Sequence, residues 1–409
     1  MDRHNAGINS ESFFLAAQQA KIRQLEDLMS ALQWVDVICD LIHALQRERG
    51  LSNVYLVCQK TTLANEFTEQ LLICDKALAE FNAALPPLLQ GRESANPSLL
   101  NLIAGALSTL EQLPALRASN QTRELLPIDS TLAYNRTIET LLLIVFELID
   151  LATDPDVAQS LTAFFLLIQL KEYVGQERAW TLIGFSRGHF IARLQERLNR
   201  LSMTQQEVRE RMLNCADSEL LDAYERLNSG PVAMDLNRFR QVRNNLSAGS
   251  EVNTDLTDVW YHKITDYIDA LHTIETQAMR SIILLCMNRI ETAQQSNNLV
   301  REKLDELNEM PDIPVSQLLK GSAESSPIQA LIAEQQRQIQ SLQLELSNSR
   351  KALEARKLVE RAKSILMNNL HLSEEDSFRR LQKSAMDQNS PLEEIAKKVI
   401  SAHQSYSKN

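Results

Sequence analysis

Apolar residues recur every three or four positions along most of this chain, which is the spacing of one face of an α-helix. The pattern predicts helices over about 13–56, 62–85, 99–113, 130–152, 155–184, 188–201, 204–215, 217–227 and 256–307. Prolines and polar runs at 86–87, 91–97 and 127–130 predict the breaks between the first helices. We therefore expect an all-α body, and the number of helices fits two four-helix bundles that share long helices.

The pattern changes after residue 310. Segment 311–327 holds three prolines, one glycine and four serines, a composition typical of a linker. Beyond the linker, apolar residues return every seven positions with polar interruptions, which predicts a coiled-coil-like helix that packs within its own chain or pairs with a second chain. The positions that repeat are Ile332, Ile339, Leu346 and Leu353.

The last sixty residues predict a long helix followed by two short ones. Ser373 precedes three acidic residues, a good helix start, and Ser390 begins a capping box with proline at the first helical position. The chain therefore divides by sequence into a helical body at 1–310, a linker at 311–327, a coiled-coil-like helix at 328–349 and a small three-helix domain at 350–409.

Composition narrows the class of protein. Only 10 glycines and 11 prolines occur in 409 residues, too few for the turns of a Rossmann, P-loop or all-β fold. The seven histidines and five cysteines are scattered without metal-ligand spacing, so we expect no metal, no disulfide and a reducing compartment. The segment 184–188 matches the sequence pattern of a nucleophile elbow, but that motif requires a preceding strand and a helix is predicted here instead. We expect no enzyme.

The sequence also predicts a cytoplasmic location without a membrane span. The start of the chain lacks a basic segment followed by an apolar run, so no secretory signal is expected. The most apolar windows, 141–149 and 161–170, are much shorter than the roughly 20 residues that a span needs.

Charge is unevenly distributed along the chain. The formal net charge is -11. Residues 350–409 carry 12 Lys and Arg against 8 Asp and Glu, net +4, so the rest of the chain is net -15. A basic end on an acidic body can dock on phosphates, or it can be a solvated helix surface.

A short motif occurs twice, 129 residues apart. Residues 46–52 read QRERGLS and residues 175–181 read GQERAWT, both late in a long predicted helix. If the two helices pair with approximate two-fold symmetry, Arg49 and Arg178 approach one another across the bundle. Two facing guanidiniums repel unless an anion lies between them, and their planar forks of donors fit nitrate, nitrite or a carboxylate. We therefore predict an anion sensor.

The alternative is structural. Glu48 and Glu177 stand next to the two arginines and could neutralise them as ordinary ion pairs. Arg238 is a weaker third candidate for the anion site, because it lies in a predicted break between helices from which its side chain could reach a ligand.

Residues 142–190, which end in LKEYVGQERAWTLIGFSRGHF, resemble the nitrate- and nitrite-sensing (NIT) domain family. QRERGLS at 46–52 is similar to the Glu-Arg-Gly motif of that family, and WYHKIT at 260–265 is similar to its closing helix. The resemblance covers about 35–285. It implies that nitrate or nitrite is a regulatory ligand, with no other cofactor, and that Gly50 and Ser52 join Arg49, Arg178 and Arg238 in its site.

The C-terminal segment resembles the ANTAR RNA-binding domain family nearly motif for motif, through RKLVERAKSILM at 356–367, LSEEDSF at 372–378 and the residues that follow. Ser364 stands where that family usually has glycine, and Lys357 where arginine is frequent. The resemblance implies binding to hairpins of a leader mRNA, usually as a homodimer. The expected RNA-binding residues are Arg356, Lys357, Arg361, Lys363, Arg379, Arg380 and Lys383.

Two functions therefore remain open at the level of sequence. In the first, a NIT domain joined to an ANTAR domain is a transcription antiterminator that binds nitrate or nitrite, then leader RNA, and so acts indirectly on the transcription elongation complex at a nitrate assimilation operon. In the second, the chain is a non-enzymatic helical scaffold whose basic tail docks an acidic protein partner.

Overall fold

In the computed structural model the chain divides into two compact units, Met1–Glu309 and Met310–Asn409. The structure describes residues 10–57, 61–90, 96–246, 249, 251–308, 362, 366, 374–387 and 392–406.

The first unit is built from long helices, as the apolar periodicity predicts. Several of them begin at proline in the first turn, and Asn96 and Asp154 cap two of these starts by accepting hydrogen bonds from backbone amides. No strand occurs among the described residues. The helices are α1 (Ser10–Val57), α2 (Thr61–Gln90), α3 (Pro97–Leu110), α4 (Leu113–Gln121), α5 (Pro127–Ile149), α6 (Pro155–Ser186), α7 (Ala192–Cys215), α8 (Ser218–Ser229), α9 (Pro231–Asn244) and α10 (Leu256–Asn308).

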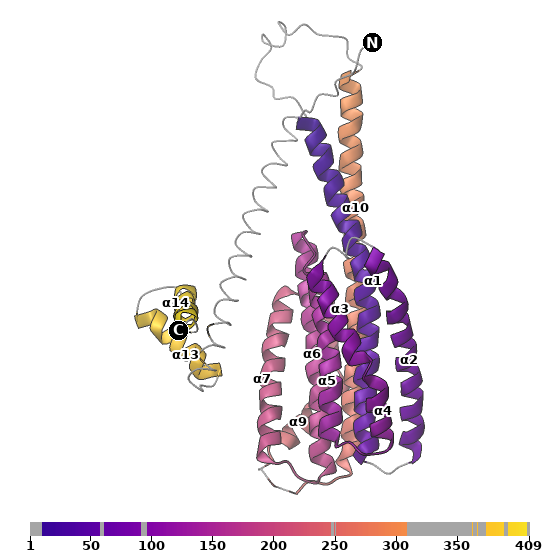
Figure 1. The fold of residues 1–409 in the computed structure, drawn as a ribbon, viewed down its shortest axis with the longest axis vertical. Helices are drawn as coiled ribbons and strands as arrows, with labels where there is room; N and C mark the ends of the chain where they lie inside the picture. Colours follow the sequence, from indigo (N-terminus) through magenta and orange to yellow (C-terminus); the bar gives the residue numbers. More distant parts are fainter. Residues whose placement is uncertain are drawn as a thin grey trace. The chain divides into compact units, whose positions relative to one another are not determined.

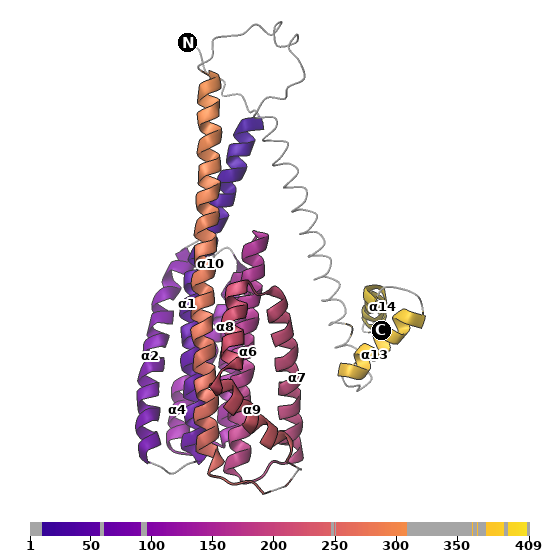
Figure 2. The ribbon, with the colours of Figure 1, turned by 180° about the vertical axis from the view of Figure 1, so that it is seen from behind.

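These helices enclose two hydrophobic cores. The first core lies among α1, α2, α3 and α5 and includes the start of α6 and the middle of α10. The second lies among α6, α7, α8, α9 and the first half of α10, with the end of α1. Figures 1 and 2 show α2 and α7 at opposite edges, with α1, α6 and α10 between them. The all-α prediction of two bundles that share long helices is therefore confirmed.

Helix boundaries differ from the sequence prediction at several places, and α4 lies where the sequence predicts no helix. α2 continues through the proline pair at 86–87, and α7 continues through the predicted break at 202–203. In α7 the hydroxyl of Thr204 donates to the carbonyl of Arg200, and Leu201 and Val208 are buried on either side. The packing of these apolar side chains stabilises the helix across the predicted break. The predicted break around Arg238 is wrong, because α9 occupies it.

α1 and α10 extend beyond the other helices of the first unit at the same end (Figures 1 and 2). By length and composition alone, Leu15–Val57 and Pro97–Gln121 are apolar enough to cross a membrane, which the short sequence windows did not predict. In Leu15–Val57, 56% of the apolar window is buried inside the protein. A core helix passes the same test, and the middle of α1 fills the first core.

In the second unit, α13 (Glu374–Asp387) and α14 (Leu392–Tyr406) pack together. Their small core consists of Ala362, Leu381, Ile395, Ala396 and Ile400. The predicted linker at 311–327 and the predicted coiled-coil-like helix at 328–349 lie outside the described residues and stay predictions.

Candidate anion-binding site

The two copies of the repeated motif meet where α1 and α6 cross. Each arginine lies against the glycine of the other helix. A Cβ atom added at Gly50 of α1 would lie 2.6 Å from Cζ of Arg178, and a Cβ added at Gly175 of α6 would contact Nη2 of Arg49. Both arginine side chains are completely buried. The predicted approach of Arg49 and Arg178 across the bundle is thus what the structure shows, and the two glycines make it possible.

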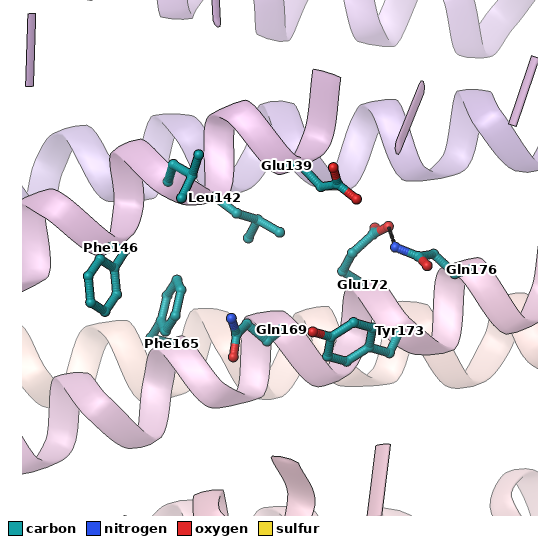
Figure 3. A pocket seen from close by; sticks show the side chains of 9 residues that line it. Glu139, Leu142, Phe146, Phe165, Gln169, Glu172, Tyr173 and Gln176 are labelled. Atoms are coloured by element: carbon teal, nitrogen blue, oxygen red, sulfur yellow. Dashed lines mark hydrogen bonds between the residues drawn. The ribbon is translucent and has the colours of Figure 1, made fainter. Parts of the chain in front are cut away.

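Arg49 is neutralised by a carboxylate of α6. Its Nη1 donates to Oε1 of Glu172 at 2.6 Å and to Oδ1 of Asn135 at 2.5 Å, and its Nη2 donates to Oε2 of Glu172 at 3.1 Å. The side-chain amides of Gln46 and Gln176 donate to the same carboxylate, each at 2.9 Å. Figure 3 shows the Glu172 and Gln176 side chains side by side on α6. Glu172 is therefore held from both helices.

Arg178 has neutral partners. Its Nη1 donates to the hydroxyl of Thr265 on α10 at 3.0 Å, and its Nη2 donates to the carbonyl oxygen of Gln46. The ring of Tyr261 lies 5.6 Å from Cζ. Among the described residues, no carboxylate accepts a hydrogen bond from this guanidinium. The pKa of Arg178 is lowered to about 10, mainly by burial; Tyr261 opposes this change and the charge of nearby Arg49 adds to it.

The glutamates of the repeated motif do not neutralise the arginines beside them. Glu48 accepts two hydrogen bonds from Arg117, both at 2.7 Å, and one from the hydroxyl of Tyr134. The structural alternative drawn from the sequence is therefore wrong about the partners on this side of the crossing.

Glu177 is the equivalent residue on α6. It accepts hydrogen bonds from Arg240 at 2.6 and 2.9 Å and from Arg243 at 2.7 Å, both on α9. Burial alone would raise the pKa of Glu177, but the two guanidiniums outweigh burial and lower it to about 2. Both motif glutamates thus bind other helices to the crossing and leave Arg178 without a carboxylate.

Two donors at the crossing are unused. The Nε atoms of Arg49 and Arg178 are buried and have no hydrogen-bond partner among the described residues. Buried N–H groups almost always have partners, and a buried charge without a counter-ion is costly. The arrangement therefore offers a small planar oxyanion two donors and an excess of positive charge.

A cavity of about 520 Å³ lies beside this crossing, between α5 and α6. Figure 3 shows an apolar end around Phe146 and Phe165 and a polar end around Glu139, Glu172 and Gln176. Burial and the carboxylate of Glu172 raise the pKa of Glu139. The cavity reaches the partner of Arg49 rather than the guanidiniums themselves.

Two other predicted site residues lie elsewhere. Arg238 is on α9 with a side chain that is 78% exposed, and it pairs with Asp235 at 3.5 Å, so the structure does not bring it to the arginine pair. Ser52 is buried and donates to the hydroxyl of Tyr134 at 3.2 Å, within the hydrogen-bond network of Glu48. Gly50 has no side chain with which to bind a ligand, and it contributes to the site by leaving room for Arg178.

Sequence reasoning missed three residues of the site, namely Glu172, Asn135 and Thr265. Nothing in their local sequence shows which side chain they contact, since each belongs to a different helix. The glycines carried a usable signal. With 10 glycines in the whole chain, a glycine in the interior of a long helix indicates close approach of another group.

Three of the seven candidate RNA-binding residues lie among the residues that the structure describes. Arg379, Arg380 and Lys383 are exposed on α13, and their spacing of three and four positions places them on one face. The other four, Arg356, Lys357, Arg361 and Lys363, lie outside the described residues.

Comparison with known proteins agrees with both halves of this description. Residues 40–283 match the family described as nitrate and nitrite sensing (NIT), and residues 348–400 match the ANTAR domain. Because the first match covers more than half of the chain, the protein belongs to the NIT family and carries a C-terminal ANTAR domain. It is a regulatory sensor joined to an output domain.

Two known proteins match this chain over nearly its whole length, and a third matches a part of it. The Nitrate regulatory protein of Klebsiella oxytoca is 28% identical over 401 residues, which are 95% of this chain and 94% of that protein. A solved structure of the NasR transcription antiterminator is 28% identical, with a TM-score of 0.62, and the match covers 96% of this chain and 98% of that one. The Transcriptional regulatory protein PdtaR of Mycobacterium tuberculosis is 31% identical over 137 residues, 33% of this chain and 61% of that protein.

Proposed function

We propose that this protein is a nitrate- and nitrite-responsive transcription antiterminator. The NIT domain binds the anion, and the ANTAR domain binds hairpins of a leader mRNA and prevents termination at a nitrate assimilation operon. The observation that carries the proposal is the pair of completely buried arginines at the α1–α6 crossing, one of which has no carboxylate partner. No catalytic step is part of this function.

The anion binds between the two guanidiniums and accepts hydrogen bonds from the unused Nε donors of Arg49 and Arg178. Glycine at 50 and 175 lets each guanidinium approach the opposite helix closely. A planar oxyanion bound there neutralises the charge of Arg178, so that this buried guanidinium is no longer without a counter-ion. Nitrate and nitrite have the shape and the charge that this arrangement accepts.

Binding is transmitted through α10. Thr265 of α10 accepts a hydrogen bond from Arg178, and Trp260 of the same helix donates to the carbonyl oxygen of Arg178 at 3.2 Å. The helix continues from this contact to its end at Asn308, close to where the first unit ends. A ligand that moves Arg178 therefore biases the position of α10, and an effector shifts the equilibrium by its difference in affinity for the two arrangements.

The basic C-terminal unit supplies the RNA-binding surface. Arg379, Arg380 and Lys383 on α13 contact phosphates of the hairpins, together with Arg356, Lys357, Arg361 and Lys363. The protein acts as a cytoplasmic homodimer, and its effect on the elongation complex is indirect, through the leader RNA. Support for this half comes from the ANTAR match and from the net charge of +4 on residues 350–409.

Thermal unfolding of the full-length protein in millimolar nitrate, nitrite and chloride tests the proposal. Ligand at about 100 times its dissociation constant adds roughly 2.7 kcal/mol to the free energy of unfolding. We expect a shift with nitrate or nitrite that Arg49→Ala abolishes. The matched control is Arg136→Ala, which removes an exposed arginine of α5 next to Asn135 and leaves the crossing intact.

The second arm measures binding to leader-RNA hairpins with and without nitrate. We expect nitrate to increase hairpin binding by the wild type and to leave Arg49→Ala unaffected. A wild type that shows no shift beyond that with chloride, and whose tail binds any polyanion equally well, supports the scaffold function instead.

A further inference from the structure

The charges at the α1–α6 crossing leave one positive charge unmatched. Arg49 and Arg178 each contribute one positive charge, and both side chains are completely buried. Glu172 contributes one negative charge from a side chain that is 2% exposed. Both carboxylate oxygens of Glu172 accept hydrogen bonds from Arg49, at 2.6 and 3.1 Å. With Glu172 in place the site carries a net charge of about +1.

Three neighbouring cations on α1, α4 and α6 have carboxylates of their own. Arg47 on α1 pairs with Asp269 on α10 at 2.5 Å, and Lys171 on α6 pairs with Glu275 on α10. Arg117 pairs with Glu48 at 2.7 Å, as described above. These ion pairs are already satisfied, so the unmatched charge belongs to Arg178. Its lowered pKa, caused mainly by burial, agrees with this assignment.

We infer that Glu172 determines the specificity of the site, because it restricts the site to singly charged oxyanions. The inference rests on the proposed function and adds to it the reason that sulfate and hydrogen phosphate are excluded. One nitrate or nitrite brings the net charge of the buried site to zero. A doubly charged anion would leave it at -1, with the excess charge next to the carboxylate of Glu172, and a buried unpaired charge is strongly unfavourable.

Shape alone does not give this selectivity. Sulfate also offers pairs of oxygens to the fork of an arginine, and arginine binds phosphate groups readily. The charge of Glu172 therefore decides between anions that both fit a guanidinium. It also predicts what each change of charge at the site will do.

Glu172→Gln raises the net charge of the site to +2 and keeps the size of the side chain. We expect this variant to bind sulfate, with a dissociation constant lower than that of the wild type by about a hundredfold or more, since a charge a few ångströms away in a buried site is worth several powers of ten for a divalent ion. Nitrate binding is retained or tightened. Glu139→Gln is the matched control, because Glu139 lines the same cavity as Glu172 but is exposed, so that solvent screens its interaction with Arg49. Its effect on anion selectivity should therefore be much smaller than that of Glu172→Gln.

Asn135→Asp makes the opposite change. Oδ1 of Asn135 already accepts a hydrogen bond from Arg49 at 2.5 Å, so aspartate fits the same place and brings the net charge to zero. We expect this variant to fold, to be at least as stable as the wild type without ligand, and to lose its response to nitrate. It tests the inference even where Glu172→Gln does not fold.

The experiment measures dissociation constants for sodium nitrate, sodium nitrite and sodium sulfate against a sodium chloride background, by calorimetry and thermal shift on the full-length proteins. A Glu172→Gln protein that binds nitrate and still ignores sulfate overturns the inference. So does one that loses nitrate without gaining sulfate, which would make Glu172 a positioning residue for Arg49, and so does an Asn135→Asp protein that binds nitrate normally. If the wild type itself does not respond to nitrate, the proposed function fails and this inference fails with it.

Discussion

Gly50→Ala and Gly105→Ala are the same chemical change in two helices, and we expect them to change stability in opposite directions. Alanine is favoured over glycine in a helix interior by about 1 kcal/mol. At Gly105 in α3 an added Cβ would have no atom within 4 Å, so the full gain is expected. This variant is the reference for the second one.

At Gly50 the added Cβ meets Arg178. It would lie 2.6 Å from Cζ and from Nη2 of that side chain, well inside contact distance. An exposed arginine would turn away into solvent, but Arg178 is completely buried. It must therefore give up its hydrogen bonds to Thr265 and to the carbonyl oxygen of Gln46.

Hydrogen bonds of a charged group contribute about 1.5–3 kcal/mol each. Against the helix-propensity gain of about 1 kcal/mol, the loss of two such bonds should lower the free energy of unfolding of Gly50→Ala by about 2–5 kcal/mol. The two alanine variants should then differ by about 3–6 kcal/mol. For a unit of this size, that separates their melting temperatures by roughly 6–24 °C, at about 2–4 °C for each kcal/mol.

Circular-dichroism melts of the wild type and both variants, each in millimolar nitrate and in chloride, measure the effect. Gly50→Ala should also lose the nitrate-dependent shift, because Arg178 no longer occupies its place, and Gly105→Ala should keep it. If Gly50→Ala is stabilised as much as Gly105→Ala and still responds to nitrate, the close approach of Arg178 to α1 is not needed and the reasoning is refuted.

Three further predictions concern other parts of the protein. The pKa of Glu177 is lowered from about 4.5 to about 2, so its ion pairs stabilise the fold above pH 4.5 and are lost as the pH falls toward 2. The free energy of unfolding, measured as a function of pH, should therefore fall by about 3 kcal/mol over that interval. Glu177→Gln should show a flatter profile. In a Cys58→Ser protein, a thiol reagent at pH 8 should label Cys215 first, since the other three described thiols are buried, and equal labelling of all four would contradict the packing of the bundles. Arg380→Ala and Lys383→Ala should each weaken hairpin binding and reduce its salt dependence by about one phosphate contact; an unchanged salt slope would remove α13 from the RNA interface.

Local sequence was enough to predict the helices and the central pair of arginines. The three- and four-residue apolar spacing is a property of neighbouring residues, so it gave the all-α class and most helix limits. The repeated motif likewise predicted that Arg49 and Arg178 approach one another. Where local signals alone decided, as at the break predicted around Arg238, the result was wrong, because Ala233 and Leu236 are buried against the rest of the second bundle and hold that segment in a helix.

The choice of ion-pair partners was decided only by the tertiary structure. Sequence placed Glu48 and Glu177 beside the two arginines, yet each of these carboxylates binds arginines from other helices. Arg49 instead meets Glu172, a residue 123 positions away. Neighbours on a helix point in different directions, so adjacency in sequence does not make an ion pair, and only the crossing of α1 with α6 determines which buried charge is matched and which is left for a ligand.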